Sequence, residues 1–387
     1  MDALHTQLAA WRHHLHAHPE GAFEEVNTSD YVAKVLTEMG LTVHRGIGGT
    51  GLIADLKVGT GQKVIGIRAD MDALPLTEQG AVAYASKNHG CMHACGHDGH
   101  MAMVLGTAKL LSEQPDFDGT ARFLFQPAEE PGKGALAMIA DGLLTRFPMD
   151  EIYGLHNMPG LPAGHIATRV GGIMGSEDNF VIRITGQGAH AARPHMSKDP
   201  LVIAAEIIMA LQTIVSRNLD PNEPAVISCT EIHTDGIRNA IPTYVEIKGD
   251  TRSYSVAVQT LLATRMRAIC EGICHMHGAQ CDFEYTHEFA PTVNWAEPVA
   301  VAVAAAQQVI GEEKTDGNVT QMMISEDFGV FLQHIPGCFV FLGNGVAQEG
   351  KGHLPLHNAC YDFNDDVLTT GARFFAQIIK NQMPKHT

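Results

Sequence analysis

The chain has 387 residues, of which 45% are hydrophobic and 18% are charged, an ordinary composition for a globular protein. Because domains usually hold about 100–200 residues, we expect two of them. The formal net charge of −17 argues against a nucleic acid or an anionic membrane as partner, since both require a basic face.

The N-terminal stretch MDALHTQLAAWRHHLHAHPE has no charged segment followed by an apolar run, so we expect no secretion signal. The most apolar windows, residues 201–211 and 298–310, are shorter than the ~20 residues that a membrane helix needs. The eight cysteines are scattered without the spacing of a disulfide framework. We therefore expect a soluble, cytoplasmic protein whose cysteines are mostly reduced.

The first part of the chain alternates helices with strands that end in reactive side chains. Two helices are expected before residue 41, separated by a break at residues 19–21, and a buried helix is expected over 99–111. Buried strands are expected at the start of 64–75, in 121–130 and in 151–159. Because parallel strands place their carboxyl ends at one edge of a sheet, the residues that follow them can converge there.

After residue 175 the pattern changes. It predicts strands at 179–186, 225–233, 244–253 and 281–288, with helices at about 200–217 and 256–277. This β-α-β-β-α-β order is typical of the ferredoxin-like split unit. The first pattern then returns with a helix at 297–311, a strand at 338–343 and a terminal helix. We predict an α/β domain made of residues 1–176 and 290–387, with an α+β domain, 177–289, inserted into it.

The segment HGCMHACGHDGH, residues 89–100, places four histidines, two cysteines and one aspartate together. Other candidate ligands follow the predicted strands: Asp70, Asp72, Glu129, Glu130, His156 and His357. Thiolate, imidazole and carboxylate groups together suit a borderline divalent ion such as Zn²⁺, Co²⁺, Mn²⁺ or Ni²⁺. In the Glu129–Glu130 pair, one carboxylate can bind a metal while the other serves as general base, as hydrolysis by activated water requires.

Other interpretations of these residues stay open at this point. A structural zinc site would be closed by four Cys or His ligands. Cys91 and Cys95 would be a redox pair, but their spacing is not C-x-x-C. We interpret His89, His93 and His100 as bystanders or as partners of ligands. The GQG at 186–188 lacks the later glycine and the helix start of a dinucleotide site, and its glycines, like Gly345, fit turns.

The motifs ACGHDGH, FQPAEE, GLHNMP, GQGAHAARPH, ISEDFG and a late LHN occur in this order, and the chain resembles the M20-type metallopeptidase and amidohydrolase family. The closer resemblance is to the branch of hippurate hydrolase, N-acyl-amino-acid amidohydrolases and plant auxin-conjugate hydrolases. It covers nearly the whole chain, from residue 12 onward. It implies a metallopeptidase-type catalytic domain, with a mixed sheet flanked by helices, and an inserted ferredoxin-like domain that makes the dimer and acts as a lid.

The resemblance also implies roles for individual residues. The ligands of a two-metal centre match Cys95, His97, Glu130, His156 and His357. Glu129 matches the general base, and Asp72 matches an aspartate that orients a site histidine, most directly His97. His190 matches a histidine of the inserted domain that reaches the partner subunit's site and stabilises the oxyanion. The wider family carries His-x-Asp where this chain has Asp70-Met-Asp72, and the thiolate ligand leaves the identity of the ions (Zn, Mn, Co or Ni) open.

The expected reaction is hydrolysis of the amide bond of a hippurate-like or related N-acyl amino acid, giving a carboxylic acid and a free amino acid. The substrate's carboxylate needs a cation or N–H donors, for which Arg252 and Asn239 are the candidates, ahead of Arg193 and Arg238.

The alternative function is an aminopeptidase or dipeptidase with the same centre, which would need an anionic group for the free substrate amine. A binding module without catalysis and a structural zinc protein are further alternatives, which the intact pair of glutamates disfavours. We expect a homodimer, with the pairing of dimers into tetramers left open.

Overall fold

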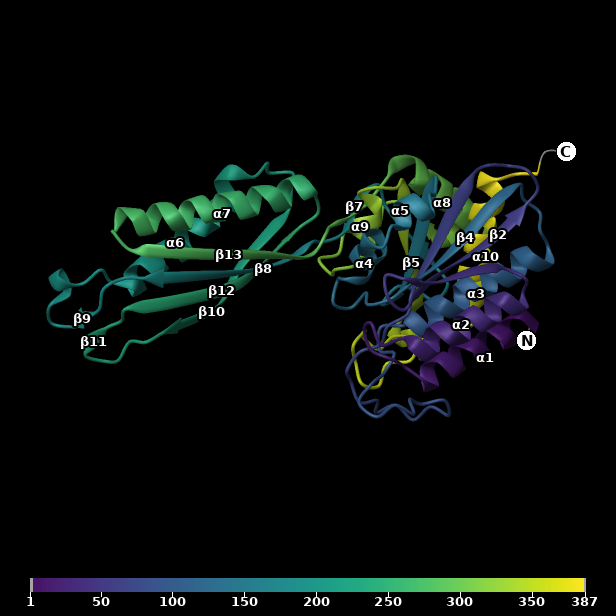
Figure 1. The fold of residues 1–387 in the computed structure, drawn as a ribbon, viewed down its shortest axis with the longest axis horizontal. Helices are drawn as coiled ribbons and strands as arrows, with labels where there is room; N and C mark the ends of the chain where they lie inside the picture. The colour runs from purple at the N-terminus through teal and green to yellow at the C-terminus, as the bar shows by residue number, and fades with distance from the viewer. Residues whose placement is uncertain (1–2, 386–387) are drawn as a thin grey trace. The chain divides into compact units, whose positions relative to one another are not determined.

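The structure is a computed structural model that describes residues 3–385, and it divides into two compact units (Figure 1). The first unit comprises Met1–Ile173, Val293–Thr320 and Asp327–Thr387, and the second comprises Met174–Thr292 and Gln321–Glu326. Each unit has a hydrophobic core of its own.

The first unit is built on an eight-stranded sheet with the order β1-β2-β4-β3-β5-β16-β6-β15. The strands are β1 (Thr42–Ile47), β2 (Gly51–Val58), β3 (Val64–Asp70), β4 (Gly119–Gln126), β5 (Glu151–Pro159), β6 (Ile166–Ala167), β15 (Thr315–Asp316) and β16 (Gly337–Gly345). The central strands β4, β3, β5 and β16 run parallel, whereas β1 and β2 form an antiparallel edge. The parallel strands are almost wholly buried, as their apolar sequences predict.

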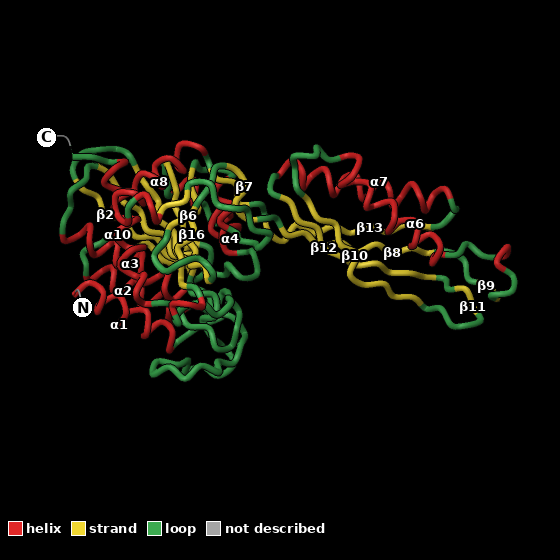
Figure 2. Tube along the Cα trace, turned by 180° about the vertical axis from the view of Figure 1, so that it is seen from behind, coloured by secondary structure: helices red, strands yellow, loops and turns green. Residues whose placement is uncertain are grey.

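Helices cover both faces of this sheet (Figure 2). One face carries α1 (Ala3–Ala17), α2 (Val26–Glu38), α3 (His97–Glu113), α8 (Ala296–Ile310) and α10 (Leu368–Gln382). The other face carries α4 (Gly134–Ala140), α5 (Leu143–Arg146) and α9 (Phe328–Leu332). Alternate residues of β3, Ile65, Ile67 and Ala69, join the core beneath α3, because successive side chains of a strand point to opposite faces.

The second unit is a four-stranded antiparallel sheet with the order β10-β12-β8-β13. Its strands are β8 (Glu177–Thr185), β10 (Ala225–Thr234), β12 (Tyr244–Ser253) and β13 (Gln280–Phe289), and its helices are α6 (Pro200–Thr213) and α7 (Val256–Met276). In chain order these elements give β-α-β-β-α-β, so the predicted ferredoxin-like unit is confirmed. A short ribbon of β9 (Ala189–His190) and β11 (Ala240–Ile241) extends it.

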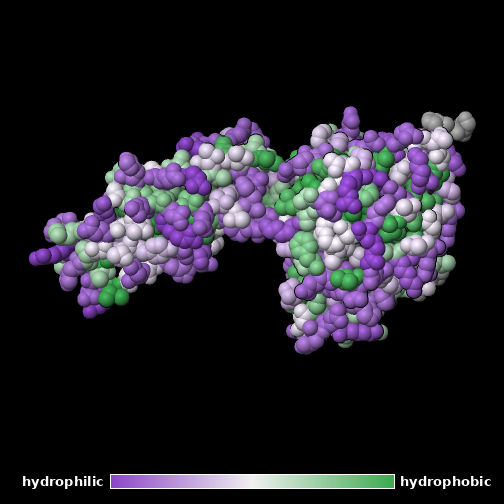
Figure 3. All heavy atoms as spheres, viewed as in Figure 1, coloured by the Kyte–Doolittle hydropathy of each residue, from purple (hydrophilic) through white to green (hydrophobic). Residues whose placement is uncertain are grey.

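One helical stretch, Pro200–Asn218, is long and apolar enough by length and composition to cross a membrane, with a mean hydropathy of 1.5 and 33% of the window buried. Its Ile203, Ile207 and Leu211 lie in the core of the second unit. Elsewhere, on the face seen in Figure 3, hydrophilic residues dominate and apolar residues form small separate patches.

Candidate metal centre

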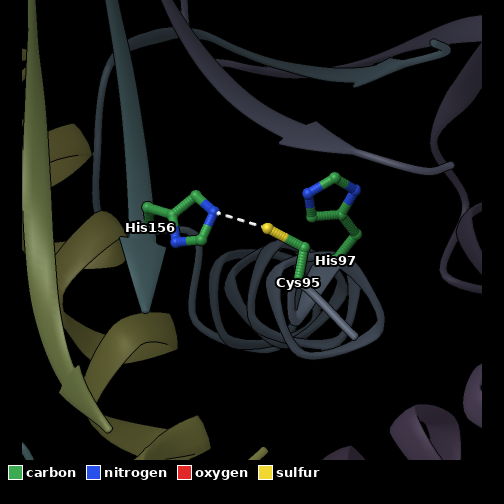
Figure 4. Close-up of side chains that lie close together, drawn as sticks. All are labelled: Cys95, His97 and His156. Carbon is green, nitrogen blue, oxygen red and sulfur yellow. Dashed lines mark hydrogen bonds between the residues drawn. The ribbon is translucent and has the colours of Figure 1, made fainter. Parts of the chain in front are cut away.

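The five residues expected to bind metal all belong to the first unit and come from four separate segments. Cys95 precedes α3, His97 is its first residue, Glu130 follows β4, His156 lies in β5, and His357 lies in the loop after β16. Figure 4 shows Cys95 between the two histidines, with its Sγ 3.3 Å from Nε2 of His156. The donor atoms of Cys95, His97 and His156 lie within 4.8 Å of one another, as do those of Cys95, Glu130 and His357.

The turn between Cys95 and His97 depends on a glycine. Gly96 has a φ of 93°, a left-handed conformation that glycine adopts without strain. A Cβ at this position would lie 2.2 Å from Oδ1 of Asn157. The Cys-Gly-His spacing therefore lets two donors from one turn point into the same site.

Two histidines are oriented through their second ring nitrogen. Nδ1 of His97 donates to the backbone carbonyl of Asp72 at 2.8 Å, and Nδ1 of His156 donates to the carbonyl of Asn157 at 2.7 Å. In both rings Nε2 is therefore the nitrogen that remains for a metal ion, as in metal-binding histidines. Asp72 thus acts on His97 through its carbonyl, while Oδ1 of Asp72 lies 3.4 Å from the ring.

Two polar atoms of the centre are buried and make no hydrogen bond within residues 3–385, namely Nε2 of His97 and Oε1 of Glu130. They lie 3.9 Å apart. An unpaired buried polar atom costs about 1–3 kcal/mol. A divalent cation between these atoms would satisfy both of them, so the residues present fit a metal ion.

The pKa values of the candidate metal ligands are shifted by burial and by nearby carboxylates. Burial raises the pKa of Glu130 to about 7, against the opposing effect of the charge on His97. Burial would lower the pKa of His97, but Asp70 and Asp72 raise it to about 10. Burial, followed by the charge on Glu130, holds the pKa of the Cys95 thiol well above its usual range. Cys95 therefore binds a metal as thiolate only by releasing a proton.

His357 reaches the centre from an unusual backbone conformation. Its φ is 62°, and its N–H donates to the carbonyl of Ala94 at 2.8 Å. Its Nε2 lies 3.5 Å from Oε2 of Glu130, and its side chain is 54% exposed. The residue therefore forms the solvent side of the centre.

A buried network beneath the centre extends beyond the residues singled out from sequence. Asp70 accepts hydrogen bonds from Nδ1 of His100 and Nη1 of Arg68, both at 2.7 Å. Nε2 of His100 lies 2.7 Å from Oδ1 of Asn157, so both ring nitrogens of this histidine are occupied. His100 is accordingly a partner of the centre, although it lies close enough to His97 and Asp70 to resemble a ligand.

The remaining predicted site residues belong to the second unit. His190 in β9 and Asn239 lie together, because Ala191 N donates to the Asn239 carbonyl at 3.0 Å. Arg252 in β12 is already paired, with Nη1 at 2.9 Å from Glu177 and Nε at 3.0 Å from Asp250.

The chain thus forms an α/β unit with a mixed sheet, and a βαββαβ unit is inserted into its sequence. At the carboxyl ends of its parallel strands lies a buried cluster of Cys, His and Glu. These features define a metal-dependent hydrolase with two units. The chain belongs to Peptidase family M20/M25/M40, whose sequence profile matches residues 66–381. The predicted family, fold class and enzyme class, a hydrolase acting on amide bonds, are confirmed.

Curated relatives resemble the chain over most of its length. It is 38% identical to a hippurate hydrolase of Campylobacter jejuni, over 95% of this chain and 94% of that one. It is 36% identical to an N-acetylcysteine deacetylase of Bacillus subtilis, over 97% of each chain. It is 41% identical to an N-acyl-L-amino acid amidohydrolase of Geobacillus stearothermophilus, over 77% and 80%.

Among solved structures, the chain resembles the Bacillus subtilis YXEP protein, described as a dinuclear metal binding peptidase from the M20 family. The two share 33% sequence identity and a TM-score of 0.85, and the match covers 99% of each chain.

Proposed function

We propose that this enzyme hydrolyses the amide bond of N-acyl amino acids, releasing a carboxylic acid and a free amino acid. The observation that carries the proposal is the pair Glu129–Glu130 at the donor cluster. Glu130 has a buried oxygen that makes no hydrogen bond to any residue in the range 3–385, and Glu129 is a second carboxylate, 5% exposed, beside it. The substrate class is supported by the names of the three curated relatives, all of which act on acylated amino acids or an acylated cysteine.

Two divalent ions per subunit would be held by Cys95, His97, Glu130, His156 and His357. Two overlapping donor groups support this number, since one contains His97 and His156 and the other contains Glu130 and His357, with Cys95 common to both. When bound, the ions supply Lewis acidity that acidifies a water molecule and polarises an amide carbonyl. The mixed thiolate, imidazole and carboxylate set suits Zn²⁺, Mn²⁺, Co²⁺ or Ni²⁺.

The proton transfers fall to Glu129. Its carboxylate accepts a proton from the attacking water and later donates it to the nitrogen of the leaving amino acid. Nε2 of His97 lies 3.9 Å from Oε2 of Glu129, so the base borders the donor cluster. We propose that His190, contributed by the partner subunit, stabilises the oxyanion of the tetrahedral intermediate.

The carboxylate of the substrate would be bound by Arg252 and Asn239. Arg252 is a strong cation, yet its ion pairs with Glu177 and Asp250 compete with a substrate anion. Asn239 can bind without such competition through its side-chain amide. Replacement of Asn239 by Ala should therefore raise KM for an acylated amino acid more than it lowers kcat.

The second candidate function is that of an aminopeptidase or dipeptidase with the same centre. The test is a panel of hippurate, N-acetyl-L-methionine, indole-3-acetyl-alanine and a free dipeptide, with metal-free enzyme reloaded with Zn²⁺, Mn²⁺ or Co²⁺. Metal-dependent release of amino acid from an acylated substrate supports the amidohydrolase. Cleavage of the dipeptide alone would assign the enzyme to the peptidases instead.

We also propose that the enzyme is a homodimer formed through the second unit. The helix α6 exposes Val202 (58%) and Met209 (71%) in addition to the residues that it buries. Single exposed apolar residues are common, but several on one helix favour a protein interface. Sedimentation velocity should give a dimer for the native chain and a monomer after Met209→Lys, whereas a monomeric native chain would contradict the proposal.

A cytoplasmic location is proposed from the state of the cysteines. All eight are free thiols, and one of them, Cys95, must remain reduced to bind metal. Cell fractionation would test the location.

A further inference from the structure

The catalytic pair Glu129–Glu130 is carried by a tight turn directly after β4. Ala128, the residue before the pair, has a φ of 47°, which a side chain with Cβ rarely adopts. Such a conformation costs about 1–3 kcal/mol and persists only where the surroundings enforce it. The question is therefore which groups hold the turn.

Three consecutive N–H groups of this turn each donate to a carboxylate. Glu129 N and Glu130 N donate to the two oxygens of Asp72, each at 3.0 Å. Ala128 N donates to Oε1 of Glu25 at 2.8 Å. The arrangement resembles an anion-binding nest of backbone N–H groups, with the anions supplied by side chains of the protein itself.

Glu25 is fully buried, although it lies at the N-cap position of α2 on the N-terminal segment. Its side chain does not cap that helix. Glu20 does so instead, accepting from Asn27 N at 3.1 Å and from Thr28 N at 2.8 Å. The Glu25 carboxylate is thereby available to the turn, and its second oxygen accepts a hydrogen bond from the hydroxyl of Thr50.

The rest of the turn is tightly packed. A Cβ at Gly134 would lie 1.6 Å from the carbonyl oxygen of Pro127. Gly134 N donates to the Ala128 carbonyl at 2.8 Å. The backbone is thus fixed from one side by neighbouring backbone and from the other by the two carboxylates. Loss of the Glu25 carboxylate would remove the partner of the N–H of Ala128, whereas loss of the Asp72 carboxylate would remove the partner of the N–H groups of Glu129 and Glu130.

We propose that Glu25 is a positioning residue of the active site, which fixes the left-handed turn at Ala128 and so aims Glu129 and Glu130 at the metal centre. The proposal rests on the proposed function for the role of Glu129. The contact of Glu25 with the turn is independent of that role. The hydrogen bonds of the Glu25 carboxylate go to Ala128 N and to the hydroxyl of Thr50, and neither residue is a proposed metal donor.

The test compares Glu25→Ala, Glu25→Gln and the matched control Glu20→Ala in the metal-loaded enzyme. Glu25→Ala should lower kcat for an N-acyl amino acid about 10–100-fold with KM nearly unchanged. Substitution of residues that orient the ligands of a metal site typically lowers activity by this factor. Glu25→Gln keeps an oxygen for Ala128 N and an N–H for Thr50, and should restore kcat to within about threefold. Glu20→Ala should lower the melting temperature and leave kcat as it is.

A second readout does not depend on turnover. Titration of the metal-free variants with Co²⁺, followed by visible absorption, reports the ligands directly. Glu25→Ala should bind Co²⁺ about 10-fold more weakly, with an altered spectrum, whereas Glu20→Ala and Glu25→Gln should match the native chain. If the native chain hydrolyses no acylated amino acid, the proposed function fails, and the Co²⁺ titration still decides the role of Glu25.

The proposal is overturned if Glu25→Ala behaves like Glu20→Ala, with reduced stability but native kcat and native Co²⁺ affinity. Should Glu25→Ala not fold, Thr50→Val removes the hydroxyl that orients Glu25. It should produce a smaller loss of kcat and of Co²⁺ affinity in the same direction. Native values of both quantities in Thr50→Val would then overturn the proposal.

Discussion

At the scale of residues, the adjacent glutamates of the site have different surroundings. Oε1 of Glu130 is buried, makes no hydrogen bond with the described part of the chain and lies 3.9 Å from Nε2 of His97, as expected of a metal donor. Glu129 lies on the same turn but is proposed to move protons. One dipeptide thus brings two carboxylates to the cluster, with Oε2 of Glu129 and Oε1 of Glu130 each 3.9 Å from Nε2 of His97.

Replacement of Glu129 by Gln should leave metal binding nearly unchanged and lower kcat about 10²–10⁴-fold, the usual contribution of a general base. Metal content by atomic emission and hydrolysis of hippurate check this. The matched variant Glu130→Gln should instead lose metal affinity. Near-native turnover in Glu129→Gln would mean that another group acts as the base.

The residue scale also sets the limit of sequence reasoning. Motif order and resemblance predicted Cys95, His97, Glu130, His156 and His357, and the structure brings all five to one site. They could not predict Glu25, because it acts through a contact with Ala128, which lies 103 residues further along the chain. Only the folded sheet brings Glu25 to the turn after β4.

At the scale of elements, helix α3 is tied to α1 by buried charges. Asp98 of α3 lies 2.8 Å from Nδ1 of His16 and 3.3 Å from Nη1 of Arg12, both on α1. Burial would lower the pKa of His16, but the hydrogen bond and charge of Asp98 raise it to about 9. The protonated ring therefore stabilises the folded state.

Because the pKa of His16 is higher in the folded than in the unfolded chain, its contribution is complete below about pH 6.5 and is lost as the pH rises to about 9. The loss should be about 3 kcal/mol for this buried group. Urea unfolding of the metal-free chain can be followed by the fluorescence of Trp11 and Trp295, both in the first unit. His16→Gln should lose the part of the pH dependence that comes from His16 and keep the part that comes from His97, whereas the exposed control His275→Gln should retain both parts.

Close packing of the helices gives a further prediction. At Gly106 of α3, a Cβ would lie 2.7 Å from a methyl group of Leu8 and 3.0 Å from Cβ of Ala372, whereas Gly272 of α7 has open space. Gly106→Val should destabilise the first unit by about 1–3 kcal/mol through overpacking. Gly272→Val should change stability by less than about 0.5 kcal/mol. Equal effects of the two substitutions in urea unfolding would contradict this packing.

The elements of the second unit were predictable from the pattern of apolar residues. Apolar and polar residues alternate in its strands, and its helices are long enough to show the helical period of apolar positions. The hairpin of β1 and β2 and the short helices α4, α5 and α9 were not anticipated. Helices of four to seven residues, such as α4 and α5, carry too few turns to show a period. The helix α3 begins at His97, two residues before the expected start, because a left-handed Gly96 allows the turn into the helix.

At the scale of the whole molecule, the five proposed metal donors all lie in the first unit. The two units also have separate cores. Binding of metal should therefore stabilise only the first unit, by about 2.7 kcal/mol when the free metal is 100 times Kd.

Calorimetry with and without a chelator should accordingly show one transition that moves and one that does not. Tryptophan fluorescence, which reports the unfolding of the first unit, should follow the transition whose temperature changes when the chelator is added. As a control, Cys95→Ser should reduce the increase in unfolding temperature that metal binding gives to the first unit. A shift shared equally by both transitions would show that the units unfold together and that metal binding stabilises the entire chain.

The register of β8 and β13 has a consequence for how this architecture can change. Phe289 at the end of β13 is paired with Glu177 at the start of β8, so the chain enters and leaves the inserted sheet at neighbouring strand ends. An insertion with adjoining ends can be gained, lost or exchanged through a short splice. The inserted sheet is thus a module that recombination could replace in a single event, while the strands that carry the metal donors keep their order.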